Sequence, residues 1–230
     1  MGNIDARAAD ERMMRHCFAL ARKSAKQGEY PYGAVIVRNG KILAEATNRV
    51  AHDRDVTRHA EVVAICEAQD ALGSTNLDGC TLYANVEPCA FCSYAIRETR
   101  ISRVVFATPS PIMGGVSRWD ILGDRKLSDS MPEIFAPPPA VLPRFLFKEG
   151  DATLRRSSPV AWAFMRARGL LETPSRHHSG SDHHQGDATN GIAAAVGWIM
   201  RALRGRFFDR FGRGGVSRRP RASKSVKPSP

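Results

Sequence analysis

The chain has 230 residues, enough for one substantial domain with an extension or for two small domains, and its 43% hydrophobic content suits a globular core. It contains no run of about 18 apolar residues, so we expect no transmembrane helix. The net charge of +11 is concentrated in residues 149–230, which carry +9, whereas residues 1–148 carry +2. Composition therefore does not predict a nucleic-acid-binding surface within residues 1–148.

The N-terminal segment is polar and is predicted to be helical. It has no apolar signal-peptide core, so we expect a cytoplasmic protein. Apolar residues recur at three- and four-residue spacing within residues 5–27, and Gly28 follows, which predicts an amphipathic helix that ends there. The repeating residues are Met13, Cys17, Leu20 and Ala21.

An alternation of strands and helices follows this first helix. Residues 33–48, GAVIVRNGKILAEATN, are predicted to form a β-hairpin, because two apolar strands flank an Asn-Gly turn. A helix, a strand, a helix and a strand are then predicted over residues 58–72, 80–86, 89–99 and 101–107. Because single helices separate the later strands, we expect a sheet that is covered on both faces. The predicted fold class is α/β: a three-layer α/β/α sandwich whose central mixed sheet has about five strands.

The C-terminal half is less regular. Residues 107–143 are rich in proline and glycine, after which we expect a last strand at residues 144–150 and a last helix at residues 160–172. The composition changes at Thr173 to polar, low-complexity sequence. We therefore divide the chain into a domain of residues 1–172, a disordered His-rich linker of residues 173–190, a basic amphipathic helix of residues 191–213 and a disordered basic tail of residues 214–230. That helix can contact nucleic acid, an anionic membrane or a partner protein, but we favour a helix that packs on its own domain or belongs to a flexible extension.

Residues suited to metal binding and proton transfer stand at two predicted helix starts. His59 and Glu61 lie in DVTRHAEVVAICEA, and 27 residues separate Glu61 from Cys89, the first cysteine of PCAFC. One imidazole and two thiolates suit zinc, and the N-terminal end of a helix stabilises a thiolate. We therefore predict one zinc ion per chain, bound by His59, Cys89 and Cys92, with a fourth position open to water.

Other uses of the two cysteines explain less of the sequence. A redox dithiol would leave His59 and Glu61 without a role, and an iron–sulfur cluster would need more cysteines at suitable spacing. A closed structural zinc site would need a fourth ligand, for which His52 is the only candidate. A carboxylate beside a zinc-bound water can take its proton and pass it to a leaving group, so a catalytic site is favoured. The other cysteines, Cys17, Cys66 and Cys80, are expected to be buried as small hydrophobes.

The motifs RHAE and PCAFC resemble those of the zinc-dependent deaminases of the cytidine deaminase-like fold. The similarity extends over YPYGAVIVRNGKILAEATNRV, TLYANVEPCAFCSYAI and ISRVVFA, roughly residues 5–108, and looks closest to bacterial guanine deaminases and tRNA adenosine deaminases. The resemblance implies that the histidine and the two cysteines ligate zinc and that Glu61 is the proton shuttle. It also implies substrate contacts from the side chain of Asn48, the backbone of Ala60, and Pro88; an ordinary turn role for Asn48 is the alternative.

The expected reaction is the hydrolytic loss of ammonia, in which zinc hydroxide attacks the amino-bearing ring carbon and Glu61 protonates the leaving amine. No lysine or arginine occurs between residue 107 and Arg118, and phosphate neutralisation needs clustered cations. We therefore favour a small-molecule purine base or nucleoside, guanine-like first. The alternative is a tRNA-specific adenosine deaminase that forms inosine, and a more remote one is a non-catalytic zinc-binding module.

Three further expectations concern the surroundings of this site. Arg58 is expected to reach a substrate phosphate or ribose, or else to point to solvent. Trp119 is expected to stack on the base, or else to pack in the core. A homodimer is expected by analogy with other proteins of this fold.

Overall fold

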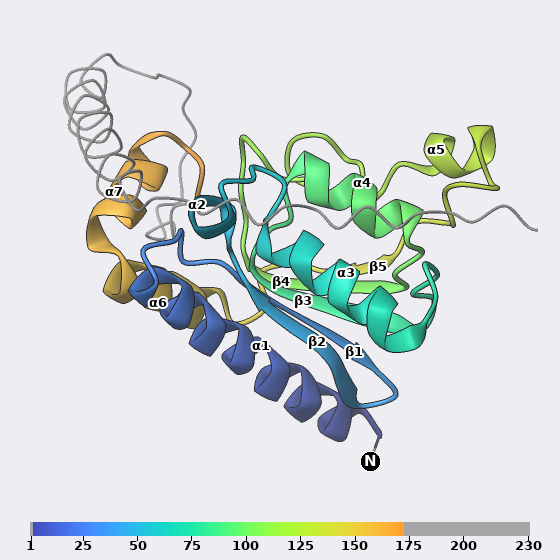
Figure 1. Cartoon of the computed structure of the whole chain (residues 1–230), viewed down its shortest axis with the longest axis horizontal. Helices are drawn as coiled ribbons and strands as arrows, with labels where there is room; N and C mark the ends of the chain where they lie inside the picture. The colour runs from blue at the N-terminus through green and yellow to red at the C-terminus, as the bar shows by residue number, and fades with distance from the viewer. Residues whose placement is uncertain (1, 173–230) are drawn as a thin grey trace, which may run out of the picture. The chain divides into compact units, whose positions relative to one another are not determined.

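A five-stranded mixed β-sheet forms the centre of the computed structural model, which describes residues 2–172 (Figure 1). The strand order is β2-β1-β3-β4-β5; β1 pairs antiparallel with β2 and β3, whereas β4 pairs parallel with β3 and β5. The strands are β1 (Gly33–Arg38), β2 (Lys41–Thr47), β3 (Cys80–Val86), β4 (Arg103–Thr108) and β5 (Ala140–Leu142). The predicted hairpin and mixed sheet are confirmed. The linker, amphipathic helix and tail predicted for residues 173–190, 191–213 and 214–230 lie outside the described residues.

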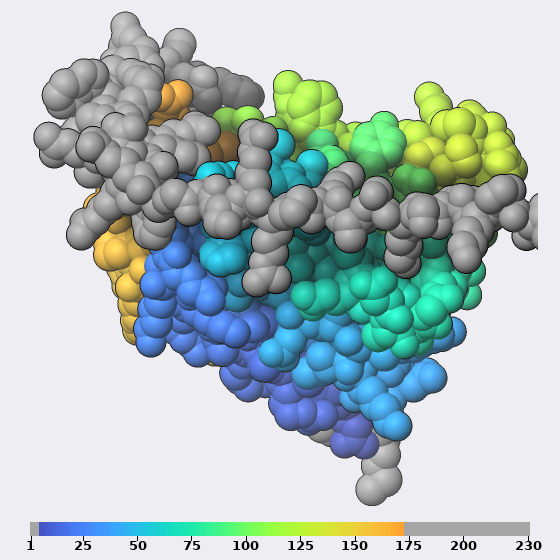
Figure 2. All heavy atoms as spheres, viewed as in Figure 1, coloured from blue at the N-terminus to red at the C-terminus, as the bar shows by residue number. Residues whose placement is uncertain are grey.

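Helices cover both faces of the sheet, so the predicted three-layer sandwich is confirmed. The helices α3 (Ala60–Leu72) and α4 (Ala90–Glu98) lie on one face, and α1 (Gly2–Lys26) and α6 (Phe147–Ser157) lie on the other (Figure 1). Figure 2 shows the edge strand β2 as a light-blue band between α1 and α3. The shorter helices are α2 (Val50–Asp53), α5 (Arg125–Ser130) and α7 (Pro159–Ala167). Within the described residues, we find no helix that is both long enough and apolar enough to cross a membrane.

The two faces of the sheet contribute to separate apolar cores, because successive strand residues point in opposite directions. On β1, Ala34 and Ile36 are buried with residues of α3, whereas Val35 and Val37 are buried with residues of α1. The buried face of α3 is dominated by small side chains, among them Ala60, Ala64 and Ala68. Small side chains allow a helix to lie close to the strands beneath it. The position of α3, and of the residues at its start, is therefore fixed by the core.

Several chain segments meet at one end of the sheet. The register places Gly33 opposite Thr47 and Ala34 opposite Ala84, so the start of β1 adjoins the ends of β2 and β3. Because β3 and β4 are parallel, β4 ends there as well. The segments that enter or leave these strand ends, including the starts of α3 and α4, are therefore brought together there.

One predicted strand is wrong. Residues 144–150 do not form a strand, because Arg144 and Leu146 have positive φ angles of 59° and 55°, which interrupt an extended chain, and α6 begins at Phe147. The fifth strand is β5, which lies in the segment expected to be loop. The last predicted helix is confirmed in part, since α7 ends at Ala167.

Candidate metal centre

The predicted zinc ligands come from the starts of two helices on the same face of the sheet. His59 is the N-cap residue of α3 and Cys89 is the N-cap residue of α4, both with extended backbone angles, and Cys92 lies in the first turn of α4. His59 Nδ1 is 3.5 Å from Cys89 Sγ and 3.4 Å from Cys92 Sγ, and the two sulfur atoms are 3.6 Å apart. The structure therefore brings the three residues together, although 30 positions separate His59 from Cys89.

These distances fit one zinc ion. With Zn–S bonds of about 2.3 Å and Zn–N bonds of about 2.0–2.1 Å, tetrahedral coordination requires S···N separations of about 3.6 Å and an S···S separation of about 3.8 Å. The observed separations agree with these values to within about 0.2 Å. Within residues 2–172, this trio is the only group of three or more His, Cys, Asp or Glu side chains whose ligand atoms are close enough to hold a metal ion. The predicted zinc cofactor is supported by this geometry.

The two cysteines also have the charge state that suits a cation. The neighbouring Cys92 thiol and the His59 side chain lower the pKa of Cys89 to about 4, so its sulfur is a thiolate at neutral pH. The same thiolate, together with burial, raises the pKa of Cys92. The pair therefore retains a single proton between two sulfur atoms, and metal binding would release it.

Glu61 is the second residue of α3 and is buried, with only 8% of its surface exposed. Burial, followed by the negative charge of Cys89, raises the pKa of its carboxyl group to about 7. A carboxyl group with a pKa near neutrality can both accept and donate a proton under ordinary conditions. Its place two residues after His59 suits the predicted shuttle role.

Glu87 is an important residue that the sequence analysis missed. Its buried carboxylate accepts hydrogen bonds from the backbone N–H groups of Ser110, Val116 and Ser117, and from the Ser117 hydroxyl group. A Cβ atom at Gly114 would lie 2.2 Å from this carboxylate, so only glycine lets the loop approach so closely. Glu87 thus fixes the loop of residues 110–117 beside PCAFC.

Backbone hydrogen bonds complete the attachment of this loop. Ala90 donates to the carbonyl group of Met113, and Gly115 donates to that of Pro88. The motif proline is therefore placed between the zinc ligands and the loop, which is a positional role that the sequence did not show. The consecutive residues Gly114 and Gly115 are compatible with a close approach of this loop to its neighbours, but two glycines in a loop have many explanations.

The other predicted substrate-binding residues lie close to these elements in the fold. Asn48 is buried directly after β2, where its backbone N–H donates to the carbonyl group of Tyr32 and its side-chain Nδ2 donates to Glu29 Oε2 over 2.8 Å. Ala60 is buried as the first residue of α3. The N–H groups of the first helical turn have no partner within the helix, so the backbone there can donate to a bound ligand.

Three polar or aromatic candidates have other contacts. Arg58 lies 3.4 Å from a carboxylate oxygen of Asp55 and 3.8 Å from one of Asp53, so it is engaged with acidic side chains. His52 Nδ1 is within hydrogen-bond distance of Asp53 Oδ1, at 2.7 Å, and His52 is not part of the metal-binding trio. Trp119 is 56% exposed, with the Arg118 guanidinium group over its ring, so the alternative of core packing is wrong. Of the three remaining cysteines, Cys17 and Cys80 are buried as predicted, but Cys66 is exposed.

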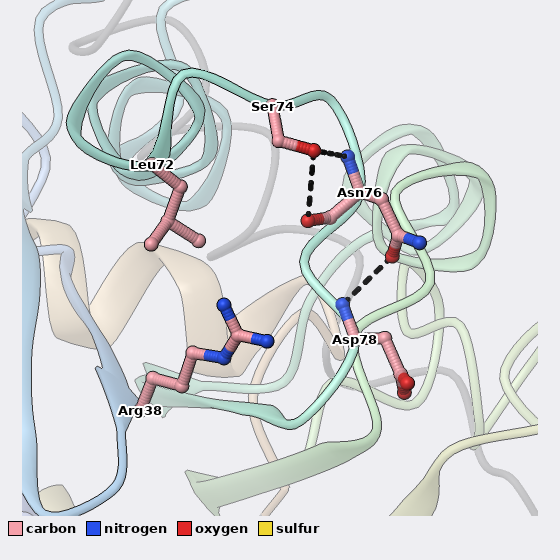
Figure 3. Close-up of a pocket in the computed structure, with 5 residues that line it drawn as sticks. All are labelled: Arg38, Leu72, Ser74, Asn76 and Asp78. Atoms are coloured by element: carbon pink, nitrogen blue, oxygen red, sulfur yellow. Dashed lines mark hydrogen bonds between the residues drawn. The ribbon is translucent and has the colours of Figure 1, made fainter.

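A separate polar pocket lies beyond the far end of α3 (Figure 3). It is lined by Arg38, Leu72, Ser74, Asn76 and Asp78. Because α3 has 13 residues at about 1.5 Å each, its two ends are about 20 Å apart, and the pocket does not share residues with the metal centre.

Comparisons with known proteins match the part of the chain that forms this site. A family model of the cytidine and deoxycytidylate deaminase zinc-binding region matches residues 7–108. The tRNA-specific adenosine deaminase of Aquifex aeolicus is 42% identical over 109 residues, which cover 47% of this chain and 72% of that protein. The chloroplastic tRNA(adenine(34)) deaminase of Arabidopsis thaliana is 37% identical over 139 residues, but this stretch spans only 11% of that longer protein.

Solved structures show the same fold. One from a study of A-to-I editing by tRNA:A34 deaminases at the wobble position has a TM-score of 0.54 and 31% identity, covering 62% of this chain and 99% of that one. A guanine deaminase from Nitrosomonas europaea has a TM-score of 0.50 and 23% identity, covering 64% of this chain and 83% of that one. At 23% identity, the similarity to the guanine deaminase shows a shared fold only.

Removal of one ligand should abolish stoichiometric zinc binding. We expect about one zinc per chain in the wild-type protein and roughly a tenth of that or less in Cys89→Ser, because His59 and Cys92 alone hold the ion poorly. Zinc content measured by mass spectrometry after dialysis tests this. Cys66→Ser, which removes an exposed thiol from α3, is the matched control and should keep its zinc. Full zinc content in Cys89→Ser would refute the ligand assignment.

Proposed function

Because the chain belongs to the zinc-dependent deaminases that share the cytidine and deoxycytidylate deaminase zinc-binding region, we propose that it is a hydrolase that converts adenosine to inosine in a tRNA. The support for the reaction class is the metal-binding trio with a buried carboxyl group beside it. The support for the substrate is the identity of about 40% to proteins named tRNA-specific adenosine deaminases, in organisms as distant as Aquifex aeolicus and Bacillus subtilis.

The guanine-like small molecule that we favoured from sequence has weaker support. The Nitrosomonas guanine deaminase shares 23% identity, which shows the fold and carries no argument about the substrate. Few cations follow β4, and their scarcity there favoured a small molecule. Three arginines instead precede the metal ligand His59, at positions 49, 54 and 58. Cations in that segment can also contact an RNA backbone, but Arg49 and Arg58 are paired with acidic side chains, so this support is weak.

An exposed aromatic ring beside the metal centre also suits a base that is presented from single-stranded RNA. The ring of Phe91 lies edge-on to His59, with ring centroids 5.9 Å apart, and is 48% exposed. Unstacked bases are commonly held against aromatic side chains. We propose that Phe91 forms part of such a surface. The stacking role of Trp119 stays a prediction, as do the homodimer and the cytoplasmic location.

The chain's own residues account for the proton transfers of the proposed reaction. Zinc, when bound by His59, Cys89 and Cys92, supplies a Lewis acid that makes a water molecule more acidic. The carboxyl group of Glu61 accepts a proton beside this site and donates it to the departing amino group, so that adenosine and water give inosine and ammonia. Asn48 and the backbone at Ala60 hold the purine, and the burial of Glu61 limits its exchange of protons with solvent.

The substrate proposal predicts activity on an RNA. We expect the zinc-loaded protein to form inosine in a tRNA anticodon stem-loop with adenosine at the wobble position, and to release little ammonia from guanine or guanosine. Inosine is measured by nuclease digestion and mass spectrometry, and ammonia by a coupled assay. The same stem-loop with guanosine at that position is the control. Turnover of guanine with no inosine in the RNA would restore the small-molecule alternative.

The proton-shuttle proposal predicts a large loss of activity without loss of metal. Glu61→Gln should lower kcat by about a hundredfold to ten-thousandfold, because an amide cannot transfer the proton. Zinc content and thermal stability should stay near those of the wild type. Glu67→Gln, an exposed position on the same helix, is the control and should change kcat by less than about twofold. A Glu61→Gln enzyme with wild-type kcat would exclude this role.

A further inference from the structure

Glu29 is a buried carboxylate that the zinc chemistry does not use. It lies between α1 and β1 and is 9% exposed, yet it takes part in no ion pair among the described residues. A charge buried in this way is costly unless hydrogen-bond donors surround it. Two such donors are present: Asn48 Nδ2 lies 2.8 Å from Glu29 Oε2, and the backbone nitrogen of His52 lies 2.7 Å from Oε1.

This arrangement fixes the orientation of the Asn48 amide group. An asparagine side chain has a donor side and an acceptor side of nearly equal shape, so packing alone does not distinguish them. An ionised carboxylate only accepts hydrogen bonds. Asn48 must therefore direct its nitrogen toward Glu29, which leaves its oxygen and its second N–H for other partners. Asn48 is 2% exposed, so water provides little competition for this contact.

We propose that Glu29 is a positioning residue that fixes the Asn48 amide group and thereby sets which donor and acceptor atoms meet the purine edge. This proposal rests on the proposed function, because it takes Asn48 to be the residue that contacts the base. A site that hydrogen-bonds its substrate through fixed polar groups discriminates strongly against a mismatched pattern. Glu29 would thus act on specificity through Asn48, without touching the substrate.

Glu29→Gln separates this role from a purely structural one. The glutamine has almost the same shape, and its oxygen can still accept from the His52 N–H. Its NH₂ group would then face Asn48, which must turn its own oxygen toward it, so the atoms offered to the purine are exchanged. The fold is retained while the polar pattern is reversed.

The test is a double-mutant cycle on the adenosine-containing stem-loop. We expect Glu29→Gln to lower kcat/KM by about tenfold to a hundredfold in the wild-type background, but by less than about twofold in the Asn48→Ala background, because Glu29 acts through Asn48. Zinc content and melting temperature should be unchanged. Glu45→Gln, on the exposed face of β2, is the matched control and should be neutral. Equal losses in the two backgrounds would overturn the proposal.

A readout that is independent of turnover keeps this test separate from the substrate proposal. In a ¹⁵N–¹H correlation spectrum, the side-chain NH₂ signals of Asn48 are assigned by their absence in Asn48→Ala. We expect one of these protons to be shifted downfield and to exchange slowly in the wild type, and to lose both properties in Glu29→Gln. If the wild type forms no inosine, the substrate proposal fails, and the amide signals still decide the role of Glu29. Unchanged signals in Glu29→Gln would refute it.

Discussion

Three ligand atoms held 3.4–3.6 Å apart are the constraint on which the rest of this structure depends. A difference of a few tenths of an ångström at one of them would spoil tetrahedral coordination. The ligands occupy helix starts, where the backbone is fixed by capping geometry and where the helix dipole stabilises a thiolate. The apolar core beneath α3 and α4 in turn fixes the two helices.

Two buried carboxylates hold the chain segments around the metal centre in place. Glu87 attaches the loop of residues 110–117 to PCAFC through four hydrogen bonds. Glu29 joins the chain before β1 to the residues that follow β2. In place of hydration, Glu29 has two N–H donors and Glu87 has four N–H or O–H donors, so a change of position would leave a buried charge unsatisfied. Such residues make a site rigid without entering its chemistry.

The sequence predicted the metal centre better than its surroundings. Two short motifs contain His59, Glu61, Cys89 and Cys92, and the spacing within each motif was enough to predict a shared metal site. The roles of Glu29 and Glu87 depend on partners 19 to 30 positions away, so a single acidic residue gives no pattern to detect. The three-residue strand β5 was missed because it is too short to show an alternation. The sequence offered no firm guide to the substrate, because cations near a site can come from any segment that the fold brings there.

The coordination of the zinc ion tests the assignment of the metal ligands most directly. X-ray absorption at the zinc edge of the metal-loaded protein should show two sulfur atoms at about 2.3 Å and two nitrogen or oxygen atoms at about 2.0–2.1 Å, as expected for two cysteines, one histidine and one position left for water. A shell of four sulfur atoms, or one without sulfur, would contradict the assignment of His59, Cys89 and Cys92.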